Sequence, residues 1–244
     1  MGSSPTEPTI FSDMSNIFKR KDKKIFFRHV PKTGGSSLQS LLIDNGWEIE
    51  KRRPYNEKLA NIEICGDHNH LHHKIIKDYW LCDWEFEFSI TRNPYERFRS
   101  VLRRDAIQLE TEVRRAGRTK THPMGDSNFI FDTDEKYITH WVDCIFTRNF
   151  PTDGVGIANN HFRPQNEFVS DTTKLYKLET IDLLVDDLKC RNYVRRDAIL
   201  PHLNTFTKHR IDFDISWHNI SSLHNMFIKL YEKDFLIFDY KVRF

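Results

Sequence analysis

Short apolar runs alternate with longer amphipathic stretches along this chain. Residues 24–30 (KIFFRHV) are rich in β-prone side chains and end at Pro31, which predicts a buried strand. Leucines at helical spacing follow in residues 36–43, so a helix should begin directly after the intervening glycine turn. The same patterns predict further strands at 62–66, 85–90 and 174–178, and further helices at 71–81, 94–115, 135–146 and 181–190.

This alternation of strands and helices predicts an α/β fold, with a central, mostly parallel sheet between two helical layers. The length of 244 residues suits one such domain, and no Pro/Gly/Ser-rich linker divides it. The polar stretch 1–22 is expected to be a poorly ordered leader, although its first residues also fit a myristoylation pattern. We therefore expect a single domain over residues 23–244.

The net charge of +2 gives no reason to expect nucleic acid or an anionic membrane as a partner. Basic residues crowd the segment 103–120, which is either a flank for an anionic polymer or a solvated face. No apolar run is long enough to span a membrane. The four cysteines are widely spaced without a CxxC pair, which argues against a zinc or redox site and leaves buried thiols or two disulfides open.

The segment between the first predicted strand and helix, residues 29–38 (HVPKTGGSSL), is a candidate anion-binding loop. Tandem glycines let the backbone turn tightly, and the helix N-terminus adds free N–H donors and a positive dipole end. Lys32 precedes the glycines, whereas a Walker A loop needs its lysine after them, so a loop of that type is not indicated. The candidate binding residues are Pro31, Lys32, Thr33, Gly34, Gly35, Ser36 and Ser37.

A second candidate phosphate site follows the predicted strand at 85–90. Arg92 stands at the end of that strand, where a guanidinium can bind a phosphate bidentately. Ser100 lies about two helical turns along the next helix and can donate its hydroxyl. The alternative is that Arg92 pairs with an acidic neighbour while Ser100 is merely exposed. Open α/β sheets bind ligands at the carboxyl ends of their strands, so both candidate sites lie where one ligand can reach them.

The sequence PKTGGSS at 31–37 resembles the 5′-phosphosulfate loop of sulfotransferases, in the family 2 branch with the carbohydrate sulfotransferases and bacterial relatives. Residues 89–100 look like the 3′-phosphate motif of that family. The resemblance implies a fold like that of the P-loop NTPases, the donor 3′-phosphoadenosine 5′-phosphosulfate (PAPS) and no metal. It implies that Lys32 contacts the bridging oxygen and 5′-phosphate, and that Arg92 and Ser100 hold the 3′-phosphate. Similarity to the chondroitin and dermatan 4-O-sulfotransferases continues through 161–165 (HFRPQ), 176–180 and 231–240.

A histidine cluster at 67–73 (DHNHLHH) offers a general base, because histidine titrates near neutral pH. His70 precedes a leucine, as in bacterial relatives, and His68 and His70 match two histidines of the heparan 2-O-sulfotransferase branch. The resemblance therefore implies His70 as the base, with His68 as second choice or helper. A metal site and a solvated histidine patch are the alternatives, but no familiar ligand spacing completes the metal site.

His161 and Arg163 are candidate contacts to a sulfate or carboxylate of the acceptor, or else parts of a structural loop. The resemblance implies a carbohydrate or another hydroxylated molecule as acceptor, and a cytoplasmic enzyme, with a trimmed lumenal domain of a Golgi membrane enzyme as the alternative. Two rival functions remain open. One is a non-catalytic nucleotide- or glycan-binding module on the same fold, and the other is a variant nucleotide kinase, which would lack its usual phosphate lysine. The pattern indicates no oligomeric state.

Overall fold

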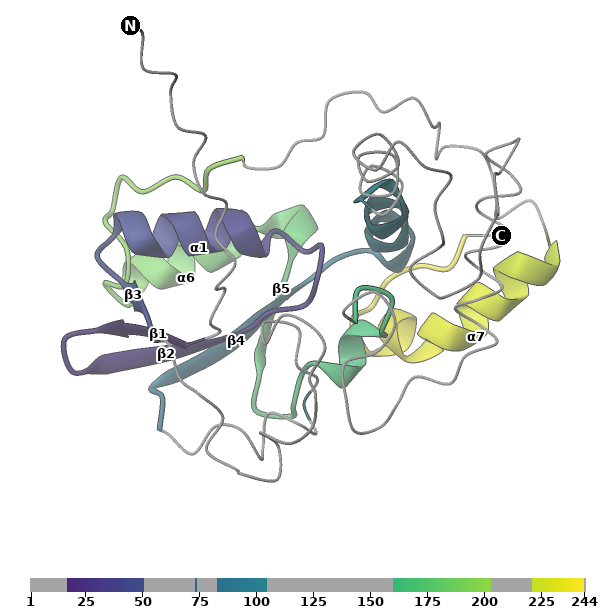
Figure 1. The fold of residues 1–244 in the computed structure, drawn as a ribbon, viewed down its shortest axis with the longest axis horizontal. Coiled ribbons are helices and arrows are strands. Elements are labelled where there is room, and N and C mark those ends of the chain that lie inside the picture. The colour runs from purple at the N-terminus through teal and green to yellow at the C-terminus, as the bar shows by residue number, and fades with distance from the viewer. Residues whose placement is uncertain (1–16, 51–72, 74–82, 105–159, 203–220, 244) are drawn as a thin grey trace, which may run out of the picture.

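The computed structural model describes residues 17–50, 73, 83–104, 160–202 and 221–243, drawn in colour in Figure 1. Its strands are β1 (Ile17–Arg20), β2 (Lys23–Arg28), β3 (Glu48–Ile49), β4 (Phe86–Thr91) and β5 (Lys174–Lys177). Its helices are α1 (Gly35–Asp44), α6 (Asp182–Cys190), α7 (Ser221–Ile237) and the described part of a helix at 94–104, with short 3-10 turns η2 (Gln165–Glu167) and η3 (Leu178–Thr180).

The strands form one mixed sheet in the order β3-β1-β2-β4-β5. β2, β4 and β5 are parallel, whereas β1 runs antiparallel to both β2 and β3. The predicted α/β fold is confirmed. The prediction of a mostly parallel sheet did not say where antiparallel strands would lie, and the structure has them at the β1–β3 edge.

β1 corrects the expected leader, since it lies inside the stretch 1–22. Ile17 and Phe18 are buried, and a two-residue turn at Lys21 and Asp22 joins β1 to β2. Lys21 has a φ of 56°, the positive φ that such tight hairpin turns use. The charged run around this turn concealed a strand with only two apolar residues. The domain therefore begins before residue 23.

The predicted elements that fall on described residues are found close to their expected bounds. The strands predicted at 24–30, 85–90 and 174–178 correspond to β2, β4 and β5. The helices predicted at 36–43 and 181–190 correspond to α1 and α6, and the helix predicted from 94 begins at Pro94. Outside the described residues lie the predicted elements 62–66 and 135–146, the helix 71–81 except residue 73, and the predicted end of the third helix near 115.

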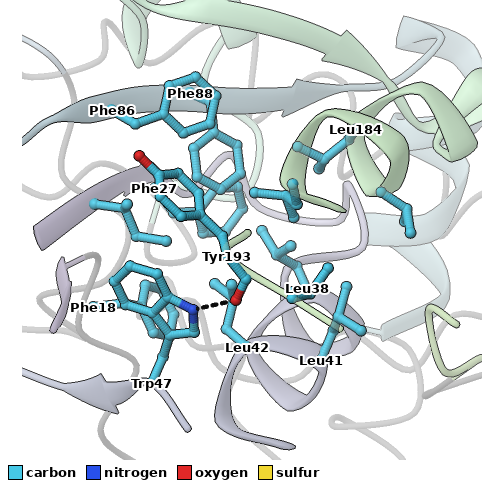
Figure 2. Close-up of a cluster of buried hydrophobic side chains, with 14 of the residues drawn as sticks. Phe18, Phe27, Leu38, Leu41, Leu42, Trp47, Phe86, Phe88, Leu184 and Tyr193 are labelled. Atoms are coloured by element: carbon cyan, nitrogen blue, oxygen red, sulfur yellow. Dashed lines mark hydrogen bonds between the residues drawn. The ribbon is translucent and has the colours of Figure 1, made fainter. Parts of the chain in front are cut away.

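The main hydrophobic core lies between one face of the sheet and the helices α1 and α6, which lie side by side in Figure 1. Aromatic side chains from the strands meet leucines from both helices there, as Figure 2 shows. Trp47 closes one side of this core and donates its Nε1–H to the Tyr193 carbonyl at 2.7 Å. Burying each such large apolar side chain contributes about 1.5–3 kcal/mol, so this face anchors the strands.

A second aromatic cluster joins the helix 94–104 to α7, beyond the carboxyl ends of the strands (Figure 1). The Tyr95 and Phe227 rings are 4.9 Å apart, and the Phe227 and Tyr231 rings are 4.7 Å apart. Phe98 meets Phe227 and Tyr231 edge-on. This cluster fixes the helix that follows β4 against the C-terminal helix.

The other face of the central strands carries a buried polar cluster. Arg28 on β2 pairs with Glu87 on β4, and both side chains are almost fully buried. Burial alone would raise the pKa of Glu87, but hydrogen bonds from Arg28, Thr173 and Ser170 outweigh it and lower that pKa. Arg28 also lies 3.1 Å from His73 Nδ1. In the part of the chain described here, no helix is long and apolar enough to cross a membrane.

Candidate active site

The site is built where β2 and β4 end at the same edge of the sheet. Phe27 pairs with Phe88 and Arg28 pairs with Ser89, so the two parallel strands finish side by side. The chain leaves β2 into the loop 29–34 and leaves β4 at Arg92. The two segments predicted to bind phosphate are therefore brought together by the strand pairing itself.

The loop turns through two residues with positive φ. Lys32 has a φ of 68° and Gly34 has a φ of 91°, while buried Thr33 donates its hydroxyl to the Val30 carbonyl at 2.8 Å. Gly34 is the N-cap of α1, and its carbonyl accepts the first helical hydrogen bond from Leu38 N–H at 3.1 Å. The hydroxyl of Thr33 thus fixes the turn from inside.

The N-terminus of α1 suits an anion. None of the described side chains caps it, and its first turn contains no acidic residue. Its first N–H groups therefore face the loop without an internal counter-charge, which is the condition for binding a phosphate at a helix N-terminus. Ser36 is partly exposed beside them, and Ser37 is buried.

His29 lies directly beneath the glycine turn. A Cβ atom placed on Gly35 would come within 2.2 Å of His29 Nε2, so the imidazole occupies the space that any larger residue at position 35 would need. Its ring also stacks on Phe27, with 5.4 Å between the centroids. Burial, followed by the charges of Lys32 and Arg104, lowers the pKa of His29 to about 4. The loop therefore rests on a neutral imidazole at neutral pH.

Arg92 connects the two predicted phosphate sites. Its Nη1 donates to the Lys32 carbonyl at 3.3 Å, although 60 residues separate them along the chain. Burial lowers the pKa of Arg92, while the carboxylates of Glu96 and Glu179 favour its charged form. Arginine stays protonated in proteins, so a partly buried positive charge stands beside the loop.

Arg97 clamps the same loop from behind. Its side chain is 2% exposed, and it donates to the Pro31 carbonyl at 2.9 Å and to the His161 carbonyl at 2.8 Å. Burial lowers the pKa of Arg97, and the negative charge of Asp234 opposes that shift. One guanidinium thus holds together the loop after β2, the helix after β4 and the segment at 160–165.

Gln165 and Asp234 complete the support behind Arg92. The Gln165 side chain bonds both backbone groups of Arg92, accepting from its N–H at 2.9 Å and donating to its carbonyl at 2.8 Å. Asp234 on α7 accepts hydrogen bonds from the backbone N–H groups of Gln165 and Asn166, both at 2.8 Å. A continuous line of hydrogen bonds therefore runs from α7 to the end of β4.

A family model described as a sulfotransferase family matches residues 15–241. The chain belongs to the sulfotransferase family. The matched residues include the loop after β2, Arg92 and the segments that support it, so the general chemistry of this domain is sulfuryl transfer. No curated protein and no solved structure shows a significant match to the chain.

The remaining predicted binding residues of this sulfotransferase lie at three kinds of position. Ser100 is partly exposed on the helix 94–104. His161 is buried, with its ring against the Arg104 guanidinium. Arg163 is 2% exposed and donates to Asn160 Oδ1 and to the Glu167 carboxylate. Both side chains thus make contacts within the protein, and their role toward an acceptor stays a prediction.

The predicted bases of the sulfotransferase, His68 and His70, lie outside the described residues. Among the residues that the structure does describe, no group of His, Cys, Asp and Glu side chains could hold a metal ion. Cys190 is a free, exposed thiol, and the other three cysteines are not among the described residues.

Sequence reasoning missed four residues that shape this site, namely His29, Arg97, Gln165 and Asp234. A signal existed for Arg97, since it falls at helical spacing with the buried residues Pro94 and Val101 and so on the inner face of its helix. His29 directly precedes the loop, but its burial follows from the tertiary packing. Gln165 and Asp234 act across 73 and 69 residues of sequence, and no local pattern indicates such pairs.

Proposed function

We propose that this protein transfers a sulfuryl group from PAPS to a hydroxyl of a carbohydrate or similar acceptor. The family gives the sulfuryl chemistry. The choice of PAPS is supported by two anion-binding elements at one edge of the sheet, which suit a nucleotide carrying phosphates at both its 5′ and 3′ positions. The carbohydrate acceptor is supported by the resemblance of the loop and of residues 161–165 to carbohydrate sulfotransferases.

The observation that carries this proposal is the contact of Arg92 with the loop. Arg92 Nη1 lies 3.3 Å from the Lys32 carbonyl, so the guanidinium and the loop amides are neighbours on one surface. A single nucleotide can therefore reach both elements at once. The alternative function of a nucleotide kinase is not supported by this loop, because Lys32 precedes the glycines instead of following them.

The chain's residues would act at three points of the reaction. The loop amides and the N-terminus of α1 would hold the 5′-phosphate, and Lys32 would place its ammonium group against the oxygen that becomes negative as the bond to sulfur breaks. Arg92 and Ser100 would fix the nucleotide through its 3′-phosphate. PAPS supplies the activated sulfuryl group, which the acceptor oxygen takes as its bond to the 5′-phosphate is lost.

The acceptor hydroxyl must lose its proton during this transfer. We propose that His70 accepts that proton, with His68 as helper, because a neutral imidazole suits a base near pH 7. Both residues precede His73, whose Nδ1 lies 3.1 Å from the Arg28 guanidinium on the sheet. His29 is a poorer candidate, since its ring is buried beneath Gly35 and its pKa is lowered to about 4.

The donor assignment is tested by calorimetry with adenosine 3′,5′-bisphosphate, the desulfated donor, in the presence of EDTA. We expect micromolar binding without a divalent cation. Binding of ATP that requires magnesium, with no binding of the bisphosphate, would instead favour the kinase. Binding of the bisphosphate without turnover on any hydroxylated acceptor would favour the non-catalytic module.

Two substitutions test the chemical roles with labelled donor and a panel of desulfated glycans. Lys32→Ala and His70→Ala should each lower turnover by at least ~100-fold, the usual effect of losing a charge stabiliser or a general base. Full turnover in His70→Ala together with its loss in His68→Ala would move the base to His68. Full turnover in Lys32→Ala would contradict the role of the loop lysine.

A further inference from the structure

Arg92 is the first residue after β4, and its backbone is held by a side chain from a distant part of the chain. We propose that Gln165 and Asp234 are positioning residues for Arg92, which set how well the site distinguishes a nucleotide with a 3′-phosphate from one without it. This inference rests on the proposed function, because it assumes that Arg92 binds the 3′-phosphate. Neither residue needs to touch the nucleotide.

The first step is the geometry of Gln165. Its primary amide accepts from Arg92 N–H at 2.9 Å and donates to the Arg92 carbonyl at 2.8 Å, so one side chain satisfies both backbone groups of that residue. A neighbouring strand would make the same pair of bonds. β5 ends opposite Thr91, since Lys177 is the last residue in its register with β4. The glutamine amide thus extends the ladder by one residue and fixes the backbone from which Arg92 projects.

The second step is the anchoring of Gln165 itself. Its backbone N–H and that of Asn166 each donate to one carboxylate oxygen of Asp234 at 2.8 Å. Gln165 and Asp234 are both 0% exposed, so neither can exchange these bonds for water. Burial raises the pKa of Asp234 to about 6, and its hydrogen bonds from Gln165 and Asn166 oppose that shift. The two oxygens are thus both engaged as acceptors in holding the turn.

The third step concerns what Arg92 gains from this support. Its guanidinium already lies 3.3 Å from the Lys32 carbonyl, so it projects toward the loop. A bidentate contact to phosphate requires its plane to be held within narrow limits. A free backbone at Arg92 would let the guanidinium sample many orientations, and the contact to a 3′-phosphate would weaken. The contacts to the rest of the nucleotide come from the loop and would remain.

Positioning of Arg92 and general stabilisation of the fold have different effects on nucleotide binding. If the two residues are purely structural, their substitution should weaken the binding of all nucleotides equally, or should only lower the melting temperature of the protein. If Gln165 and Asp234 position Arg92, their substitution should reduce the ratio of the dissociation constant of adenosine 5′-phosphate to that of adenosine 3′,5′-bisphosphate. That ratio isolates the interaction of the protein with the 3′-phosphate.

The test measures this ratio by calorimetry in the full-length protein. The variants are Gln165→Ala, which removes both bonds, and Gln165→Glu, which keeps the acceptor for Arg92 N–H but places an oxygen against the Arg92 carbonyl. Asp234→Asn keeps the shape of the side chain but turns one acceptor into a donor facing an N–H group. Asn225→Ala and Asp186→Asn, both at exposed positions, are the matched controls. Arg92→Ala defines the ratio without the guanidinium.

We expect the wild-type protein and both controls to bind the bisphosphate clearly more tightly than the 5′-phosphate. The two Gln165 variants and Asp234→Asn should lower this preference by about tenfold, the usual effect of one or two lost hydrogen bonds. If Gln165→Ala fails to fold, Gln165→Glu and Asp234→Asn give the same ratio with less change in packing. If the folded Gln165 and Asp234 variants keep the wild-type ratio while Arg92→Ala loses the preference for the bisphosphate, the positioning role alone is overturned. No preference in the wild-type protein would instead overturn the proposed function.

Discussion

Gly35 in the candidate site leaves no room for a larger residue. An alanine there would place its Cβ 2.2 Å from His29 Nε2, a distance at which the imidazole must move. His29 is buried and its ring stacks on Phe27, so any movement of the ring must displace neighbouring side chains. We expect Gly35→Ala to lower the free energy of unfolding by about 1–3 kcal/mol, as overpacking of a core usually does, in urea denaturation.

Two comparisons show whether this loss comes from the steric contact. Gly46→Ala is a control because a Cβ atom placed on Gly46 would lie 3.9 Å from Arg20 Cδ, which is an ordinary contact. The φ of 81° at Gly46 also disfavours alanine. The double variant His29→Ala with Gly35→Ala should lose less than the sum of the two single changes, because the small residue at 29 removes the clash. Additive losses would contradict the contact between these two residues.

His29 should also make stability depend on pH. Its pKa in the folded protein is lowered to about 4 from an ordinary value of 6.5, because of burial and then the charges of Lys32 and Arg104. The unfolded chain therefore binds a proton before the folded one does as the pH falls. The stability associated with neutral His29 is fully present above pH 6.5. Acidification from there to about pH 4 should lower the free energy of unfolding by roughly 3 kcal/mol through this residue.

This pH effect is measured as the difference between wild type and His29→Gln in urea denaturation at pH 7 and pH 4.5. His29→Gln should lose less stability on acidification than wild type. Asp234 acts in the opposite direction, because its pKa is raised to about 6 and the folded protein takes up its proton first. Asp234 is present in both proteins, so the same pH dependence in both would contradict the role of His29.

At the scale of elements, Arg97 joins three segments that are far apart in sequence. Arg97→Ala would leave the carbonyls of Pro31 and His161 without this donor and would remove a positive charge near Asp234. We expect a loss of about 3 kcal/mol in the free energy of unfolding, typical of breaking a buried charged interaction. Arg196→Ala, at an exposed position, is the control. Equal stability of the two variants in urea would contradict the clamp.

The elements themselves were predictable where their pattern is local. β4 and α6 follow apolar spacing that needs no knowledge of the rest of the chain, and both were predicted within about two residues, the usual uncertainty of element ends. β1 was missed because only Ile17 and Phe18 are apolar, and its burial depends on pairing with β2 and β3. The two predicted phosphate segments lie together because β2 and β4 are neighbours. The sequence indicated that both segments follow the carboxyl ends of strands, but no local pattern indicated that these two strands pair.

At the scale of the whole molecule, the candidate site lies between the two hydrophobic clusters. The loop after β2 is flanked by Phe27 and Leu38 of the main core, whereas Arg92 is supported through Gln165 by Asp234 on α7. A nucleotide bound to both should therefore stabilise the fold as a unit. Adenosine 3′,5′-bisphosphate at about 100 times its dissociation constant should add about 2.7 kcal/mol to the free energy of unfolding.

This stabilisation is measured by chemical denaturation with and without the nucleotide. Lys32→Ala at the same nucleotide concentration should show a smaller gain, because its affinity is lower. A gain of equal size in Lys32→Ala would place the nucleotide elsewhere on the protein. The nonlocal supports of the site could not have been predicted at this scale, since Gln165 and Asp234 meet only after α7 has packed.

The backbone conformation of Lys32 sets the thermal stability of the protein against the proposed role of the lysine side chain in the reaction. A φ of 68° is the left-handed conformation, which glycine adopts freely and which a side chain with a Cβ atom disfavours by about 1 kcal/mol. Lys32→Gly should therefore be more resistant to heat than Lys32→Ala, although both lack the ammonium group and both should be equally inactive. Glycine at this position would relieve the strain but would also remove the ammonium group, so the proposed role of Lys32 in the reaction would explain why a side chain stands at a strained position.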